Sequence, residues 1–96
     1  MTQVIDAAVT ALNAKLAGGG FDGIAKFVIE DEGTIMLDGS GARAGDEEAD
    51  VTMTADTDTF RAILDGALNP TAAFMTGRLR IAGDMGAAMR LGSVLS

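Results

Sequence analysis

Residues 50–55 alternate without a break between polar and apolar side chains. Val51, Met53 and Ala55 fall on one face of an extended segment, and the aspartate and two threonines between them fall on the other. Such a strand lies in a sheet with one buried face and one wet face. The pattern therefore favours an antiparallel sheet and argues against a doubly wound parallel sheet, whose strands are apolar on both faces.

In the sequence, a predicted hairpin precedes this strand. One helix is predicted before the hairpin and others after the strand. Two β-branched, apolar-rich segments, 24–30 and 34–38, are joined across Asp31-Glu32-Gly33, and the glycine-rich stretch 39–45 leaves room for a further short strand. Before the hairpin, apolar residues recur at helical spacing from a cap at Thr2 to a stop at Gly18-Gly19-Gly20.

The second half of the chain predicts three more helices and one strand. Asp56 is a typical N-cap for the helix that follows it, and Asn69 caps a short helix over 71–76, for whose first turn Pro70 is suited. A strand over 78–81 precedes a last helix that opens at Gly83-Asp84. We therefore predict a single α+β domain over 1–96, with helices packed on one face of a mostly antiparallel sheet.

Composition excludes several classes of function. The net charge is −7, with seven basic residues and no Tyr, Trp or His, which is unsuited to binding nucleic acid and allows only weak, transient, apolar contact with a membrane. The chain has no cysteine, no apolar run long enough to span a bilayer and no basic, apolar leader. We expect a cytoplasmic protein.

The usual equipment for catalysis and for metal binding is missing. Without His or Cys, no serine has an imidazole to activate it. Asp56-x-Asp58 resembles the start of a calcium loop, but Phe60 and Arg61 stand where an oxygen ligand and a glycine are needed. The spacing Gly18-x-Gly20-x-x-Gly23 matches a dinucleotide motif, yet it closes a helix and opens a strand. We expect no catalytic residue, no metal and no cofactor.

Methionine is the one unusual component. Five of the six methionines lie inside predicted elements, and flexible thioether side chains suit a wall that adapts to ligands of different shape. The alternative is that these residues fill gaps in an ordinary core, and composition alone favours that alternative.

A long block of the C-terminal half resembles the sterol-carrier-protein-2 family. The strand 49–54 is followed by Asp56-x-Asp58-x-Phe60, by a helix that ends at Leu64-Asp65-Gly66, and by a stretch from Asn69 to Asp84. The most specific part is Gly77-Arg78-Leu79-Arg80-Ile81-x-Gly83-Asp84, and the resemblance extends over residues 1 to 96.

The resemblance implies a five-stranded sheet with an apolar tunnel between sheet and helices, where family members bind fatty acids, fatty acyl-CoA, phospholipids or sterols without covalent chemistry. A long-chain fatty acid or acyl-CoA is the expected ligand. The ending Val94-Leu95-Ser96 is no peroxisomal address, which favours a free-standing bacterial member and makes a sterol less plausible. An accessory or regulatory module that assists a partner enzyme, or forms a homodimer, is the alternative. Bulky inward side chains of the predicted helices are the candidate wall: Phe60, Leu64, Phe74, Met75, Met85 and Met89.

Overall fold

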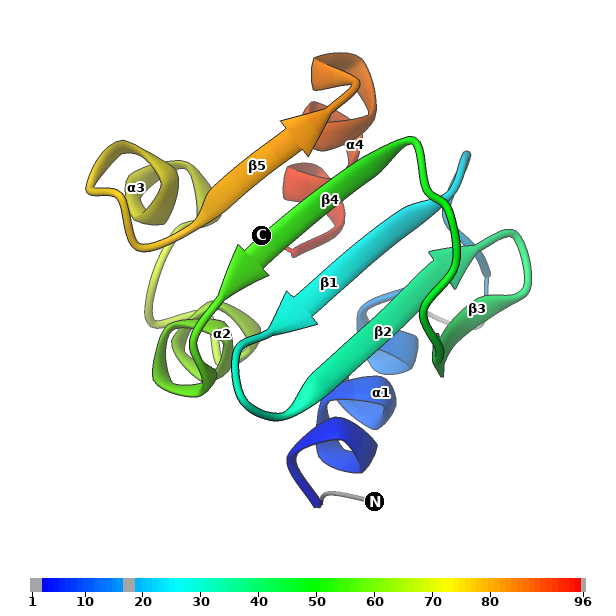
Figure 1. The fold of residues 1–96 in the computed structure, drawn as a ribbon, viewed down its shortest axis with the longest axis horizontal. Helices are drawn as coiled ribbons and strands as arrows, with labels where there is room; N and C mark the ends of the chain where they lie inside the picture. Colours follow the sequence, from blue (N-terminus) through cyan, green and yellow to red (C-terminus); the bar gives the residue numbers. More distant parts are fainter. Residues whose placement is uncertain (1–2, 17–18, 96) are drawn as a thin grey trace.

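The computed structural model describes residues 3–16 and 19–95 of the chain (Figure 1). Thr2 and Gly18, which we expected to begin and end the first helix, lie outside these ranges, as does Ser96. In chain order the elements are α1 (Gln3–Leu16), β1 (Ala25–Ile29), β2 (Gly33–Asp38), β3 (Gly41–Ala44), β4 (Val51–Ala55), α2 (Thr57–Leu64), α3 (Pro70–Met75), β5 (Arg80–Gly83) and α4 (Met85–Leu95).

The five strands form one mixed sheet in the order β3-β2-β1-β4-β5. Three of the four pairs are antiparallel, whereas β4 runs parallel to β1, with Phe27 opposite Met53. The expectation that the alternating strand 50–55 pairs in antiparallel fashion is therefore right for its β5 side and wrong for its β1 side. Segment 45–50 carries the chain from β3 across the sheet to the far side of β1 (Figure 1). Alternation of polar and apolar residues indicates that one face of a strand is exposed to solvent, but it does not indicate the direction of the neighbouring strand.

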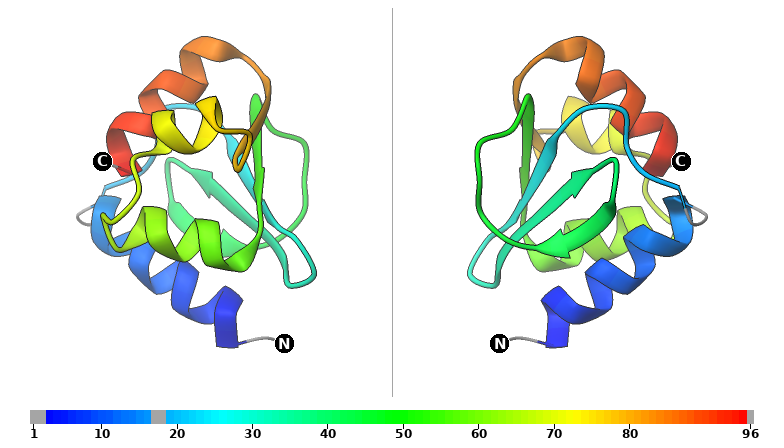
Figure 2. Two further views of the ribbon diagram at one scale, coloured as in Figure 1. Left: turned by 90° about the vertical axis from the view of Figure 1, so that its left-hand side faces the viewer. Right: turned by 90° about the vertical axis from the view of Figure 1, so that its right-hand side faces the viewer.

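The helices lie on one face of the sheet and enclose the core, as Figure 2 shows from two sides. The rings of Phe27 on β1 and Phe60 on α2 lie 5.0 Å apart at an angle of 58°, a tilted contact typical of buried aromatic pairs. The largest fully buried side chains are Leu12, Phe27, Ile29, Ile35, Met36, Leu37, Val51, Met53, Ile63, Leu79, Leu91 and Leu95.

Met36 is buried on the opposite face of the sheet from this core. The segment after β3 covers it: the N–H of Glu47 donates to the Met36 sulfur at 3.4 Å, and the N–H of Gly45 donates to the Thr34 carbonyl at 3.1 Å. This methionine therefore packs under a loop, outside the main core.

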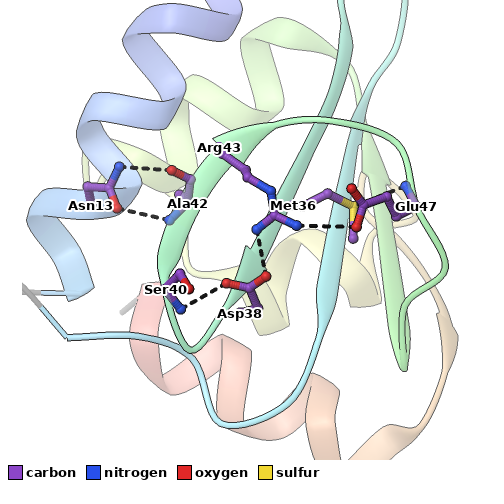
Figure 3. A network of polar contacts seen from close by, with 7 residues as sticks. All are labelled: Asn13, Met36, Asp38, Ser40, Ala42, Arg43 and Glu47. Atoms are coloured by element: carbon purple, nitrogen blue, oxygen red, sulfur yellow. Dashed lines mark hydrogen bonds and ion pairs between the residues drawn. The ribbon is translucent and has the colours of Figure 1, made fainter.

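Polar contacts hold β3 at the edge of the sheet (Figure 3). The Asn13 side chain on α1 both donates to the carbonyl of Ala42, at 3.1 Å, and accepts from its N–H, at 2.9 Å. On the same strand the Arg43 guanidinium pairs with Asp38 and with Glu47. The hydrogen bond from Arg43 holds the pKa of the Asp38 carboxyl below its ordinary value.

Two of the three predicted N-caps lie within the described residues, and both are confirmed. Asp56 accepts from the N–H of Thr59 at 2.7 Å, and Asn69 accepts from the N–H of Thr71 at 2.8 Å, with Pro70 in the first turn of α3. No helix within the described ranges is both long enough and apolar enough to cross a membrane.

Candidate functional site

A cleft of about 330 Å³ lies where α3 and α4 cover the β4–β5 side of the sheet. Its floor comes from the strands and the turn before β5, and its walls come from the two helices. The lining residues are Met53, Pro70, Thr71, Phe74, Leu79, Ile81, Met85, Ala88, Met89, Gly92 and Ser93.

The floor is apolar. Met53 and Ile81 are Cα partners in the antiparallel β4–β5 pair, so their side chains project from the same face of the sheet. Met53 and Leu79 are 1% exposed, and Ile81 is partly buried. Leu79 is buried and Ile81 is packed against the core, as we expect from the alternating residues 78–81. The strand itself begins later than predicted, at Arg80, so Leu79 lies in the turn before it.

Small side chains on α4 leave space for the cleft. Ala88 and Gly92 lie one turn apart on the face that lines it, and a Cβ atom built on Gly92 would meet no neighbouring atom within 4 Å. Met85 and Met89 flank this face, also one turn apart. The wall therefore combines flexible long side chains with open space between them.

The polar groups of the cleft are few and uncharged. Thr71 on α3 and Ser93 on α4 bring hydroxyls, and the Ser93 hydroxyl donates to the Met89 carbonyl at 3.3 Å. None of the described lining side chains carries a charge, and none of them has a carboxylate or imidazole that could act as a general base. Among the described residues, no three His, Cys, Asp or Glu side chains gather as a metal site.

The structure brings together three of the six residues predicted as ligand wall. Phe74, Met85 and Met89 all line the cleft, and they are 43%, 54% and 74% exposed. These exposures place them at its mouth rather than at its floor.

Phe60 and Leu64 lie elsewhere, in a second cavity of about 330 Å³ between α1 and α2, and Met75 is 79% exposed and lines neither. The two cavities have no lining residue in common. The lining of the second cavity is Val4, Ala7, Ala8, Ala11, Thr57, Phe60, Arg61, Leu64 and Asp65.

Sequence reasoning did not select the floor residues or the small residues of α4. Met53 already lies on the apolar face of the alternating strand 50–55, and Leu79 and Ile81 alternate with arginines over 78–81. This signal identifies a floor only once the covering helix is known. The spacing 85, 88, 89, 92 was present as an i, i+3, i+4, i+7 face, but glycine and alanine on it appear as packing residues rather than as space.

Comparison with known proteins agrees with this architecture. The profile of the SCP-2 sterol transfer family matches residues 5–96. Hydroxysteroid dehydrogenase-like protein 2 of Xenopus tropicalis is 40% identical over 81 residues, which cover 76% of this chain and 19% of that protein. Sterol carrier protein 2 of Gallus gallus is 42% identical over 80 residues, covering 72% of this chain and 14% of that protein. The chain thus spans about a fifth or less of these relatives.

A solved structure shares the fold over the whole chain. The solution structure of sterol carrier protein 2 from Aedes aegypti, in complex with the C16 fatty acid palmitate, matches with a TM-score of 0.77 and 20% identity, covering 100% of this chain and 97% of that one. Together with the family profile, this likeness confirms the fold class expected from the sequence. The chain belongs to the SCP-2 sterol transfer family.

Proposed function

We propose that this protein binds and transfers a long-chain fatty acid or fatty acyl-CoA, and that it does so without catalysing a reaction on its ligand. The observation that carries the proposal is the apolar cleft between α3, α4 and the β4–β5 floor, built on Met53, Leu79 and Ile81. Membership of the SCP-2 sterol transfer family and the palmitate bound by the Aedes aegypti protein of the same fold support it.

The size of the cleft favours a flexible ligand. A volume of about 330 Å³ is near the lower end of the ~300–1,000 Å³ typical of small-molecule sites. An acyl chain can fold into such a space in part and leave the rest at the mouth, whereas a rigid sterol has to enter as one body. Each buried methylene contributes about 0.8 kcal/mol, so a chain of about 12–16 methylenes has ample driving force after ordering costs.

The head group stays outside the cleft in this proposal. A carboxylate or phosphate buried without a charged partner is costly, and the lining residues that the structure describes include no charged side chain. Met85 and Met89 then hold the acyl chain as an adaptable wall, with Phe74 opposite them. The tunnel expected from the family resemblance would have to join the cleft to the α1–α2 cavity, and in this proposal the acyl chain occupies the cleft alone.

Two measurements on the purified protein test the proposal. Native mass spectrometry looks for lipid that co-purifies with the chain, and displacement of a fluorescent fatty acid by palmitate and by palmitoyl-CoA gives the affinities. We expect saturable displacement in the micromolar range or below and no chemical change in the recovered ligand. Absence of both co-purified lipid and saturable displacement would refute lipid binding.

The lengths of the relatives favour a second candidate function, that of an accessory module. Because the match covers 19% of the Xenopus tropicalis dehydrogenase-like protein, a domain of this family also occurs inside longer chains. This chain would then serve as an accessory module for a partner enzyme, or as a dimer. Size-exclusion chromatography with light scattering, over a range of protein concentrations, separates the homodimer from the carrier, which we expect to be a monomer in the cytoplasm.

A further inference from the structure

All the sulfur of this chain is in methionine, and the exposed methionines lie on two helices. The sequence has six methionines and no cysteine. Met36 and Met53 are at most 1% exposed. The other three described methionines have exposed side chains, Met75 on α3 and Met85 and Met89 on α4. A reagent in solution that reacts with sulfur therefore meets these three side chains first.

Met85 and Met89 combine this exposure with a place in the wall of the cleft. They lie one turn apart on α4 and both line the cleft, whereas Met75 does not. Their thioethers belong to the apolar surface that an acyl chain in the cleft would contact. A chemical change of these two sulfurs therefore alters the ligand site, while the same change at Met75 alters only the outer surface.

Hydrogen peroxide is an oxidant that makes such a change. A lone pair of the thioether sulfur attacks one oxygen of the peroxide, and an S–O bond forms as the O–O bond breaks. The departing oxygen takes up the proton of the transferred oxygen and leaves as water. The sulfur loses two electrons and the peroxide is reduced, so a polar sulfoxide replaces an apolar thioether.

The cleft offers little to satisfy a sulfoxide. The S=O oxygen accepts hydrogen bonds, and the hydroxyl donors of the described lining are those of Thr71 and Ser93. The Ser93 hydroxyl already donates to the Met89 carbonyl at 3.3 Å. Sulfoxides on Met85 and Met89 would therefore stay hydrated at the mouth of the cleft. An entering acyl chain would have to remove that water and leave the polar groups unpaired, which is costly.

We propose that Met85 and Met89 form a modification site, at which hydrogen peroxide converts both thioethers to sulfoxides and thereby lowers the affinity of the cleft for its acyl ligand. The proposal rests on the proposed lipid-carrier function. A bound acyl chain covers both sulfurs, so the empty carrier is the form that the oxidant acts on. The buried Met36 and Met53 stay reduced while the chain is folded, so binding is lost without unfolding. Methionine sulfoxide reductases reverse the change.

Peptide mapping by mass spectrometry, after timed exposure to hydrogen peroxide, tests the site itself. We expect sulfoxide at the three exposed methionines and none at Met36 or Met53, with an unchanged circular dichroism spectrum. Palmitate at about ten times its dissociation constant leaves about a tenth of the chain empty, so it should slow oxidation of Met85 and Met89 by up to about tenfold. The rate at Met75 should not change, because Met75 lines neither cavity. Equal rates with and without palmitate at Met85 and Met89 would overturn the proposal.

Fatty-acid displacement before and after the treatment measures the effect on binding. We expect oxidation to lower palmitate affinity at least about fivefold, and reductases of types A and B together to restore it, since each acts on one sulfoxide epimer. Met85→Leu with Met89→Leu removes both sulfurs, so its affinity after treatment should equal its own affinity before treatment. Met75→Leu is the matched control and should lose as much affinity on oxidation as the unmodified chain.

The outcomes separate this proposal from the proposed function. An equal loss of affinity in the double leucine variant and in the unmodified chain, or no loss after complete oxidation of Met85 and Met89, refutes the modification site alone. Sulfoxide at Met36 or Met53 with a changed circular dichroism spectrum also refutes it, because binding is then lost through unfolding. Absence of displacement by the untreated chain refutes the proposed function, and the modification site is refuted with it.

Discussion

Met53 of β4 faces Ile81 of β5 across the antiparallel pair and faces Phe27 of β1 across the parallel pair. A single row of inward side chains therefore runs from the core, where Phe27 packs against Phe60, to the cleft floor at the sheet edge. The cleft is an extension of the core that α3 and α4 cover only in part. Substitutions on its wall can consequently change ligand binding without touching the packed centre.

Gly92 offers the sharpest test of the cleft. Because its Cβ would point into open space, Gly92→Leu should place a side chain inside the cleft and lower fatty-acid affinity at least tenfold. Glycine inside a helix is about 1 kcal/mol less favourable than alanine, so the variant should be as stable as the unmodified chain or more stable. Displacement titration and urea unfolding measure the two effects separately.

Gly92→Ala is the matched control for that variant. It gains the same helical preference, about 1 kcal/mol, while filling far less space. We expect it to raise the free energy of unfolding and to keep most of the affinity. If Gly92→Leu bound fatty acid as tightly as Gly92→Ala, the ligand would have to occupy another place in the molecule.

Met89 and Met75 allow a second comparison, between a methionine that lines the cleft and one that does not. They are 74% and 79% exposed, so Gln at either position should change the free energy of unfolding by less than about 0.5 kcal/mol. Met89→Gln should weaken palmitate binding several-fold, because it replaces an apolar wall by an amide. Met75→Gln should leave the affinity in solution unchanged. Equal losses in the two variants would contradict the assignment of the wall.

Phe60 is expected to act on stability rather than on the ligand in the cleft. Its ring packs on Phe27, and both residues are nearly inaccessible to solvent, at 2% and 1%. Phe60→Ala should cost about 3–5 kcal/mol, a large part of the 5–15 kcal/mol typical of a whole domain. Phe60→Leu keeps most of the volume and should remain folded, with a lower urea midpoint and unchanged fatty-acid affinity. A selective loss of affinity in Phe60→Leu would show that the ligand reaches the α1–α2 side.

Most of the fold could be predicted from sequence because its determinants are local. The side-chain alternation of 50–55, the cap at Asp56 and the Asn69-Pro70 pair each act through neighbouring residues. The parallel pairing of β1 with β4 could not be predicted from sequence, since it depends on the path of segment 45–50 across the sheet. The burial of Met36 could not be predicted either, because the same segment covers it.

The candidate site was predictable only in part, for a related reason. Helical spacing identifies a face, and it placed Met85 and Met89 on a common one, but it does not say whether that face is packed or open. Phe60 and Phe74 look alike in sequence, each a bulky residue in a short helix. Tertiary contacts separate them, because Phe60 meets Phe27 whereas Phe74 is 43% exposed at the cleft.

Gly77 and Gly83, in the block 77–84 that resembles the family, allow the cost of a positive φ to be compared with the cost of a steric clash. Gly77 has φ of 80° and open space where a Cβ would lie, so Gly77→Ala should cost about 1–2 kcal/mol, the penalty of a left-handed conformation. Gly83 has φ of 110°, and a Cβ there would lie 2.4 Å from the backbone oxygen of Asp50. Gly83→Ala should therefore destabilise the chain more, by distorting the β4–β5 pair. Urea unfolding of both variants gives the order, and equal costs would contradict the close approach.

Asp56 should make the stability of the chain depend on pH in the acid range. The N–H of Thr59 donates to its carboxylate and holds its pKa below the ordinary Asp value of about 3.9. A lowered pKa in the folded state gives a stabilisation that is fully present above the unfolded pKa and is lost as pH falls through the folded one. Asn still caps a helix but does not titrate, so Asp56→Asn is the matched control. The difference in free energy of unfolding between the two proteins should be constant from pH 7 to about 5 and change below about 4. A difference that stays constant down to about pH 2 would show that this carboxylate is not held in the cap.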